Sequence, residues 1–263
     1  MSIKFVSVPD FDCDAVSVAF GQDRQNKPNI CMFYGVNYNQ VGMVSPAAVT
    51  NWPRVNGDGN FGTMWGPSEV TKAKFTLDLT DSFIDEQSSK DYLAFSAVIT
   101  SIDDKLLDFV FNNQLRVLGR KNLTREEVKM LQIRGLRPKY DKNSSQLMGH
   151  TVQTSTAKYV WDGMGGKGPR DINICNKDGT VIANAVVSPG DVVAATLYLN
   201  LVYTGVGGDK FGIHWSVQDV AIICQRNKLE SKSQVTEFAA QTYTFAQEYT
   251  APHDMPIETA PWP

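Results

Sequence analysis

Positive charge is concentrated in one segment of this chain, from Arg116 to Arg170. The segment holds twelve of the 25 Lys and Arg residues and only four of the 28 acids, so it carries +8. Because the whole chain of 263 residues carries −3, the rest of the sequence carries −11. Lys and Arg gathered on one surface attract phosphates, so the segment predicts a polyanion-binding groove. A solvated helix face with charged loops has the same composition, and charge alone leaves both interpretations open.

A glycine-rich run in this segment combines cations with aromatic rings. Residues 163–170 read GMGGKGPR, and two rings and a lysine precede them. Glycine lets the backbone approach a ligand closely, while stacking on Trp or Tyr and pairing with Lys or Arg grip unpaired nucleic acid. The run lacks the spacing of a nucleotide-hydrolysing phosphate loop. A long hairpin with core aromatics is the alternative interpretation. The residues expected to bind here are Lys158, Tyr159, Trp161, Lys167 and Arg170.

Other residues extend this candidate surface. The turn TGVGGDKFG, residues 204–212, is expected to project a cation and aromatic rings from a hairpin tip. A loop rich in glycine and tryptophan at residues 51–67 can close over a nucleic-acid strand, but its rings equally well pack back on the body of the protein. The further residues expected to bind nucleic acid are Arg134, Arg137, Lys139, Lys142, Tyr203, Lys210 and Phe211.

The sequence offers little for catalysis. It has three histidines and contains no HExxH, GxSxG or GxxxxGK[ST] motif. Asp103 and Asp104 are adjacent on a predicted helix, where they face different directions, and we expect both to be solvated. The four cysteines are widely spaced and lie in apolar contexts, which favours reduced core residues. We therefore expect no enzymatic activity, no metal site and no cofactor.

One long helix is predicted between two strand-rich parts. Apolar residues recur at three- and four-residue intervals from about Ser89 to Leu118, giving one apolar stripe. Gly119 is placed to end this helix, and Thr124 with Glu127 forms a capping box for a shorter one. The flanking segments alternate like strands, most clearly at residues 191–206 and 212–225. The fold class expected is therefore β-rich α+β.

The end of the chain has a different composition. Residues 246–263 contain four prolines and three acids but no Lys or Arg, which indicates a flexible tail. Such an acidic-hydrophobic peptide can dock on partner proteins or cover a basic groove, and a merely disordered end is the alternative. The expected partner-binding residues are Asp254, Ile257, Glu258 and Trp262.

Composition also sets expectations for location and domains. No run of eighteen apolar residues occurs and the N-terminus lacks the pattern of a signal peptide, so we expect an intracellular protein without membrane contact. The domains expected are a β-rich N-terminal extension at 1–70, a nucleic-acid-binding core at 71–228, a linker at 229–245 and the tail at 246–263.

Residues 70–228 combine a long central helix, the segment TAKYVWDGMGGKGPRDINI and a closing strand pair, SPGDVVAATLYLNLVYTGVGGDKFGIHWSVQDVAIICQ. This arrangement resembles the single-stranded DNA-binding proteins of large nucleocytoplasmic DNA viruses and, more loosely, those of T7-like phages. The resemblance implies an OB-fold-like Greek-key barrel with a long inserted helix. It also implies sequence-independent binding of single-stranded DNA in replication, repair or recombination, and a tail that recruits replication proteins. The protein is then expected in the host cytoplasm or nucleus, at sites of viral DNA replication, and homo-oligomer formation is left open.

Two alternatives stay open. Many strands and glycine-rich loops also suit a viral structural protein, such as a jelly-roll capsid or assembly component, although a helix of nearly thirty residues argues against a plain jelly roll. An RNA-binding or strand-annealing protein could use the same groove, because only a contact to the 2′-hydroxyl separates RNA from DNA.

Overall fold

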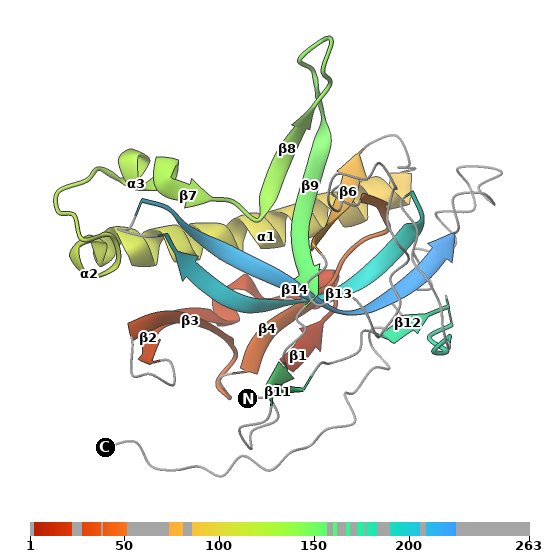
Figure 1. The fold of residues 1–263 in the computed structure, drawn as a ribbon, viewed down its shortest axis with the longest axis horizontal. Helices are drawn as coiled ribbons and strands as arrows, with labels where there is room; N and C mark the ends of the chain where they lie inside the picture. The colour runs from red at the N-terminus through yellow and green to blue at the C-terminus, as the bar shows by residue number, and fades with distance from the viewer. Residues whose placement is uncertain are drawn as a thin grey trace.

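The computed structural model describes residues 3–22, 28–37, 39–51, 74–80, 86–156, 160–161, 167–168, 173–176, 178–182, 190–205 and 209–224. Within these residues the chain forms one large twisted sheet, a separate two-stranded sheet and a layer of helices (Figure 1). The strands of the large sheet are β1 (Ile3–Val6), β2 (Val16–Gln22), β3 (Pro28–Tyr34), β4 (Asn39–Val44), β5 (Ala48–Asn51), β6 (Lys74–Thr80), β7 (Gln132–Ile133), β8 (Leu136–Tyr140), β9 (Leu147–Thr156), β12 (Asn173–Cys175), β13 (Val192–Thr204) and β14 (Phe211–Cys224). The small sheet pairs β10 (Val160–Trp161) with β11 (Lys167–Gly168).

Five strands of the large sheet close into a ring. β5 pairs with β6, β6 with β9, β9 with β14 and β14 with β13, and β13 pairs back with β5. Every pairing in the ring is antiparallel except β9 with β14, which is parallel. A five-stranded Greek-key barrel is the architecture of the OB fold, so the fold expected from the sequence is confirmed. A jelly roll needs two packed sheets, and this ring does not provide them.

The first strands of the chain belong to the same sheet as the barrel. β4 lies beside β13, with Met43 opposite Leu197, and β5 pairs with both β13 and β6. β1 then pairs with β4, and the β2–β3 hairpin follows at the edge of the sheet. The domain boundary expected near residue 70 therefore does not separate two structural units, because hydrogen-bonded pairing crosses it.

The helices include the long one that the sequence predicts. They are α1 (Glu86–Asn112), α2 (Gln114–Leu118) and α3 (Arg125–Leu131), with two short 3-10 helices, η1 (Val8–Asp10) and η2 (Cys13–Ala15). The predicted stripe continued to Leu118, but the helix breaks at Asn113, whose backbone leaves the helical region. As a result Leu115 lies on α2 and is exposed. Gly119 adopts the left-handed conformation that ends α2, as expected.

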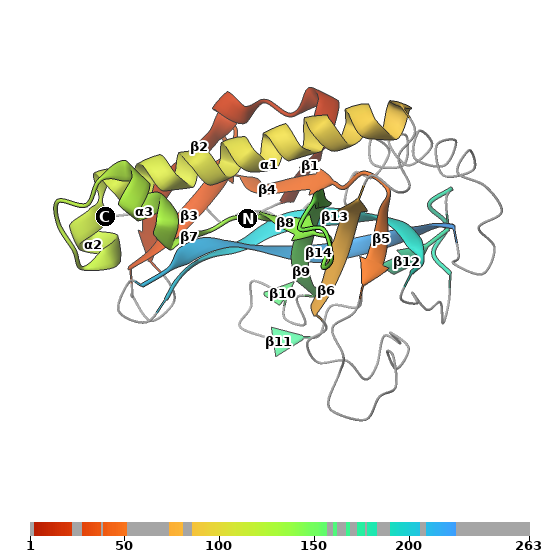
Figure 2. The same cartoon turned by 90° about the horizontal axis from the view of Figure 1, so that it is seen from above.

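The apolar face of α1 packs into the main core. Phe95, Ile99, Ile102 and Leu106 have almost no exposed surface, and they share one cluster with barrel residues such as Trp215. Figure 2 shows α1 lying along one side of the sheet, roughly parallel to the long β13–β14 pair. The contiguous burial of its stripe explains why a 27-residue helix is stable here, since helices gain most of their stability from packing.

The short helix α3 begins as the sequence predicts. The Thr124 side chain accepts a hydrogen bond from the Glu127 backbone N–H, and the Glu127 carboxylate accepts one from the Thr124 N–H. This capping box satisfies two backbone donors at once. α3 then runs directly into β7, which pairs with β14, so the cap fixes where the chain enters the barrel region.

Candidate nucleic-acid interface

The β8–β9 hairpin carries two of the predicted cations on one face. Leu136 lies opposite Val152 and both are buried, so this face of the hairpin turns toward the core. Because side chains alternate along a strand, Arg137 and Lys139 point to the other face. Arg137 is half-buried and forms no ion pair within the described residues. Its guanidinium is therefore a cation without a described counter-charge, on a face of the sheet that points away from the core.

Lys139 has a counter-charge within the sheet. Its ammonium forms an ion pair with the carboxylate of Asp78 on β6, the strand on the other side of β9. Asp78 is buried, so the lysine charge stabilises a carboxylate that has lost most of its water. Lys139 is thus partly neutralised by Asp78, and we expect Arg137 to be the stronger phosphate contact of the two.

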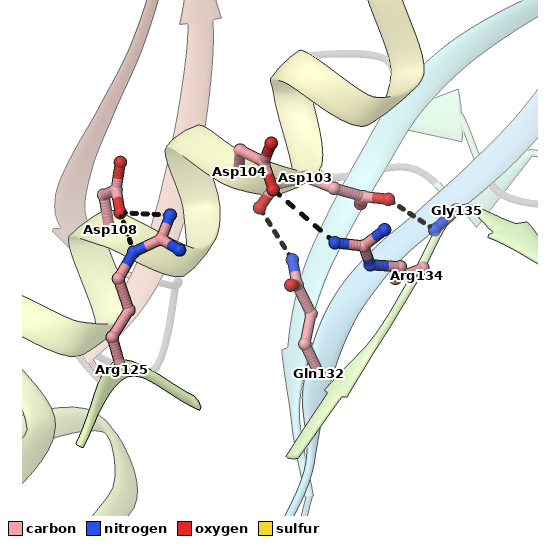
Figure 3. Close-up of polar contacts among 7 residues, drawn as sticks. All are labelled: Asp103, Asp104, Asp108, Arg125, Gln132, Arg134 and Gly135. Atoms are coloured by element: carbon pink, nitrogen blue, oxygen red, sulfur yellow. Dashed lines mark hydrogen bonds and ion pairs between the residues drawn. The ribbon is translucent and has the colours of Figure 1, made fainter. Parts of the chain in front are cut away.

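Acidic residues of α1 hold the segment that leads into β8 (Figure 3). Arg125 binds Asp108 at 2.9 Å, and Arg134 lies 3.7 Å from Asp104. Both ion pairs are largely exposed, so each contributes little to stability on its own. Arg134 was predicted to bind nucleic acid, but its charge is directed at the helix in this structure. Two of the predicted cations, Arg134 and Lys139, are therefore paired with acids of this chain.

Asp103 makes the buried part of the same contact. Its carboxylate accepts a hydrogen bond of 2.8 Å from the Gly135 N–H at the start of β8, and its carbonyl accepts one of 2.7 Å from the Gln132 side chain. A Cβ at Gly135 would lie 3.0 Å from Ile99 Cγ2 and from Trp215 Nε1, so the close approach of β8 to α1 favours glycine here.

The prediction that Asp103 is solvated is wrong. Only 1% of its surface is exposed, and Asp104 alone of the pair faces solvent, because successive helix positions point in different directions. Burial raises the pKa of Asp103 to about 7, although the Gly135 N–H and the Arg134 charge both lower it. The second carboxylate oxygen has no hydrogen-bond donor within the described residues, which is consistent with a protonated acid near neutral pH.

The β13–β14 hairpin places Lys210 and Phe211 in different surroundings. Lys210 is exposed at its turn, which the Gly205 N–H closes by donating to the Lys210 carbonyl. Phe211 has no exposed surface, so its ring cannot stack on a base and the prediction for this residue is wrong. The physical reason is that Phe211 belongs to the main apolar cluster, together with residues of α1 and the barrel.

Tyr203 of β13 lies within the electrostatic range of Arg137. The phenol is half-buried, and burial raises its pKa, which the Arg137 charge lowers and the Asp103 charge raises. An aromatic ring and a cation in one region of a protein are the two kinds of group that grip single-stranded nucleic acid.

The remaining predicted residues are only partly described. Trp161 and Lys167 are directly opposite each other in the β10–β11 pair, so their backbones lie in adjacent strands. Lys158, Tyr159, Arg170 and the tail residues Asp254, Ile257, Glu258 and Trp262 lie outside the described residues. Lys142 is exposed at the turn of the β8–β9 hairpin.

Two of the predicted loop regions leave the barrel at one edge. β5 ends at Asn51, which is opposite Thr76, and Lys74 at the start of β6 is opposite Ser155 near the end of β9. The connections at 52–73 and after residue 156 therefore begin side by side. Phe211 lies six residues along β14 from Val217, which pairs with Thr156, so the β13–β14 turn is roughly 20 Å from this edge. The structure thus separates the turn of the β13–β14 hairpin from the edge where the connections at 52–73 and after residue 156 begin.

Sequence reasoning missed a set of exposed apolar residues. Tyr140, Leu147 and Met148 cluster beside the turn of the β8–β9 hairpin, and all three are exposed. The available signal was an aromatic residue between Lys139 and Lys142, next to a turn of small polar residues. That signal was weak because the same pattern is found in half-buried strands.

Comparison with solved structures gives similarity to phage proteins. A crystal structure of gp2.5, a single-stranded DNA-binding protein encoded by bacteriophage T7, is similar over 72% of this chain and 95% of that chain, with a TM-score of 0.46 and 9% identity. The single-stranded DNA-binding protein from bacteriophage Enc34, in complex with single-stranded DNA, is similar over 80% and 96%, with a TM-score of 0.37 and 8% identity. The same phage protein without DNA is similar over 82% and 94%, with a TM-score of 0.38 and 9% identity. At these TM-scores the similarity carries no functional argument.

Other comparisons are negative. No protein-family model matches the chain, and no curated protein matches it. In the part of the chain that the structure describes, no helix is long and apolar enough to cross a membrane. The same part contains no group of three or more His, Cys, Asp or Glu side chains that could hold a metal ion.

Proposed function

We propose that this protein binds single-stranded DNA without sequence preference and acts as a binding protein, not an enzyme, in DNA replication, repair or recombination. The observation that carries the proposal is the OB-type barrel with Arg137, a cation without a described counter-charge, on the outward face of β8 beside β9. OB folds bind oligonucleotides on their second and third strands and on the loops after the first and fourth strands. Here those strands are β6 and β9, and Arg137 lies opposite Thr151 of β9.

The proposed site uses the predicted residues unequally. Arg137, Lys139 and Lys142 supply phosphate contacts on the β8–β9 hairpin, and Tyr203 of β13 supplies an aromatic ring within the electrostatic range of Arg137. The loop after the first barrel strand spans residues 52–73, and the loop after the fourth contains Lys210. We include Lys158, Tyr159, Trp161, Lys167 and Arg170 in the site on the strength of their sequence pattern. Phe211 is left out because its ring is buried.

The setting and the tail belong to the same proposal. The resemblance in sequence pattern supports a protein of a large DNA virus, acting in the host cytoplasm or nucleus where viral DNA is replicated. Residues 246–263 are acidic-hydrophobic, which supports docking on replication proteins or electrostatic competition with DNA for the basic face.

The test is a fluorescence-anisotropy titration at two salt concentrations. The probes are a labelled dT oligonucleotide, its duplex counterpart and an rU oligonucleotide of the same length. We expect tight binding to the single-stranded DNA that weakens with salt, with a slope of about −0.7 for each phosphate neutralised, and weak binding to the duplex. Equal or tighter binding to rU would make the protein an RNA-binding one. Absence of binding to every probe at low salt would overturn the proposal.

A further inference from the structure

The β8–β9 hairpin has a tip that the rest of the molecule does not cover. Figure 1 shows this hairpin projecting away from the body of the protein. Pairing of β9 with β6 ends at Gly149, opposite Thr80, and the tip lies beyond that point. At the tip, Tyr140 is 57% exposed, Leu147 is 49% exposed and Met148 is 38% exposed. Three large apolar side chains thus lie together at the exposed end of the hairpin.

The turn beneath these side chains is held by local hydrogen bonds. The Asp141 carboxylate accepts bonds of 2.8 Å from the N–H groups of Asn143 and Ser144 and one of 3.0 Å from the Ser144 hydroxyl. The Asp141 N–H donates to the Gln146 carbonyl, which closes the turn at 2.8 Å. A preorganised tip loses little conformational entropy when it binds a ligand. The turn therefore fixes the backbone on either side of it, where Tyr140 and Leu147 are attached.

Tyr140 and Leu147 form a directly opposed cross-strand pair. The irregular register between Lys139 and Tyr140 leaves Met148 as the extra residue on β9, a bulge that re-aims side chains at a strand end. A cross-strand apolar pair stabilises a hairpin modestly by itself. That contribution does not depend on exposure of the pair. Hairpin stability alone therefore does not explain why the pair lies beyond the described neighbouring elements.

Charge indicates the kind of ligand that fits the tip. The hairpin carries the cations Arg137, Lys139 and Lys142 against one carboxylate, that of Asp141. Lys139 is paired with Asp78 of β6, so one net positive charge is left for the tip and its surroundings. A second copy of this chain on the same tip would bring two positive hairpins together, whereas single-stranded DNA offers phosphates together with unpaired, apolar base faces. The combination favours single-stranded DNA as the occupant.

We propose that the tip formed by Tyr140, Leu147 and Met148 is a base-binding subsite, in which an unpaired base stacks on Tyr140 and Lys142 pairs with an adjacent phosphate. This inference rests on the proposed function and extends the DNA path from the barrel to the end of the hairpin. Aromatic and apolar side chains that contact unpaired bases read no sequence, because every base has an apolar face. The subsite therefore adds affinity without adding specificity.

The experiment compares tip variants with matched controls in anisotropy titrations with labelled dT oligonucleotides. We expect Tyr140→Ala to weaken binding by about 5- to 100-fold while the salt slope stays unchanged, since no phosphate contact is lost. Tyr140→Phe keeps the ring and should bind like the unchanged protein. Lys142→Gln should instead reduce the salt slope by about 0.7. Leu115→Ala, an equally exposed leucine on α2, is the control for Leu147→Ala and should have no effect.

The outcomes separate the subsite from the proposed function. If the unchanged protein does not bind single-stranded DNA, both proposals fail. If it binds and Tyr140→Ala binds equally well, the tip is not part of the DNA site and the proposed function stands. That second result would leave a protein partner as the explanation for the exposed apolar residues. Loss of affinity in Tyr140→Ala with an unchanged melting temperature supports the subsite.

Discussion

The β8–β9 and β13–β14 hairpins carry similar residues near their turns but differ in what surrounds them. The first has Tyr140 next to its turn and Lys142 within it, and the second has Lys210 followed by Phe211. Tyr140 is exposed, whereas Phe211 is completely buried. The same local pattern of cation and aromatic ring therefore becomes a solvent-facing tip in one hairpin and part of the core in the other.

The difference comes from what each ring packs against, because Phe211 belongs to the main apolar cluster with residues of α1 and the barrel. β7 pairs with β14 at Phe211, and the capped helix α3 leads directly into β7. The tip of β8–β9 has no such neighbour among the described elements, because its pairing with β6 ends at Gly149. An aromatic residue beside a turn is thus available to a ligand only where the tertiary packing does not place its ring in the core.

The largest expected effect is the difference in protein stability between removing the Phe211 ring and removing the Tyr140 ring. Phe211→Ala should lower the free energy of unfolding by about 3–5 kcal/mol, because it removes a fully buried ring and leaves a cavity. Tyr140→Ala should change it by only about 0.5 kcal/mol, because the site is exposed. Urea unfolding of both variants measures this. Equal destabilisation by the two substitutions would mean that the hairpin tips are not differently packed.

The second prediction concerns the base of the exposed hairpin, where Asp103 holds the start of β8. Asp103→Asn keeps an oxygen that can accept the Gly135 N–H but cannot ionise. Relative to the unchanged protein, the variant should become more stable as the pH rises from about 4 to 8, by at most about 4 kcal/mol. Asp104→Asn is the matched control, because Asp104 lies on the exposed side of α1 and its ion pair contributes little.

The sign follows from the raised pKa. Between the ordinary value of 3.8 and the folded value of about 7, the unfolded chain releases the Asp103 proton and the folded protein keeps it. This group therefore stabilises the fold most at low pH, and its contribution is lost as the pH rises through about 7. Urea unfolding of the unchanged protein and both variants at pH 5 and pH 8 tests it. A difference between Asp103→Asn and the unchanged protein that does not vary with pH would contradict the buried, protonated state.

The smallest effect concerns DNA affinity on the outer face of the exposed hairpin. Arg137→Gln should weaken binding to dT oligonucleotides by about 5-fold and reduce the salt slope by about 0.7, as expected for one phosphate contact. Arg120→Gln is the control, because Arg120 is also basic but lies in the loop between α2 and α3, away from β8. Titrations at several salt concentrations measure both. An equal effect of the two substitutions would indicate general charge attraction without a defined path along β8.

Local patterns in the sequence were enough to predict several elements. The stripe of α1, the stop at Gly119 and the capping box of Thr124 and Glu127 all depend on residues close together in the chain. The long strands β13 and β14 were likewise evident from their alternation. Local hydrogen bonding and periodicity determine these features, so a single sequence contains them.

Closure of the barrel, the burial of Asp103 and the contrast between Phe211 and Tyr140 were decided only by tertiary structure. The pairing of β5 with β13 joins Val49 to Val192, and no local pattern specifies that partner. Adjacent aspartates look alike in sequence, and only the approach of Gly135 to α1 determines which one loses its water. The sequence by itself determined a β-rich chain with one long helix and one basic segment. Which side chains reach solvent depended on strand neighbours distant in the chain, because burial is a property of contacts between elements and not of the residues alone.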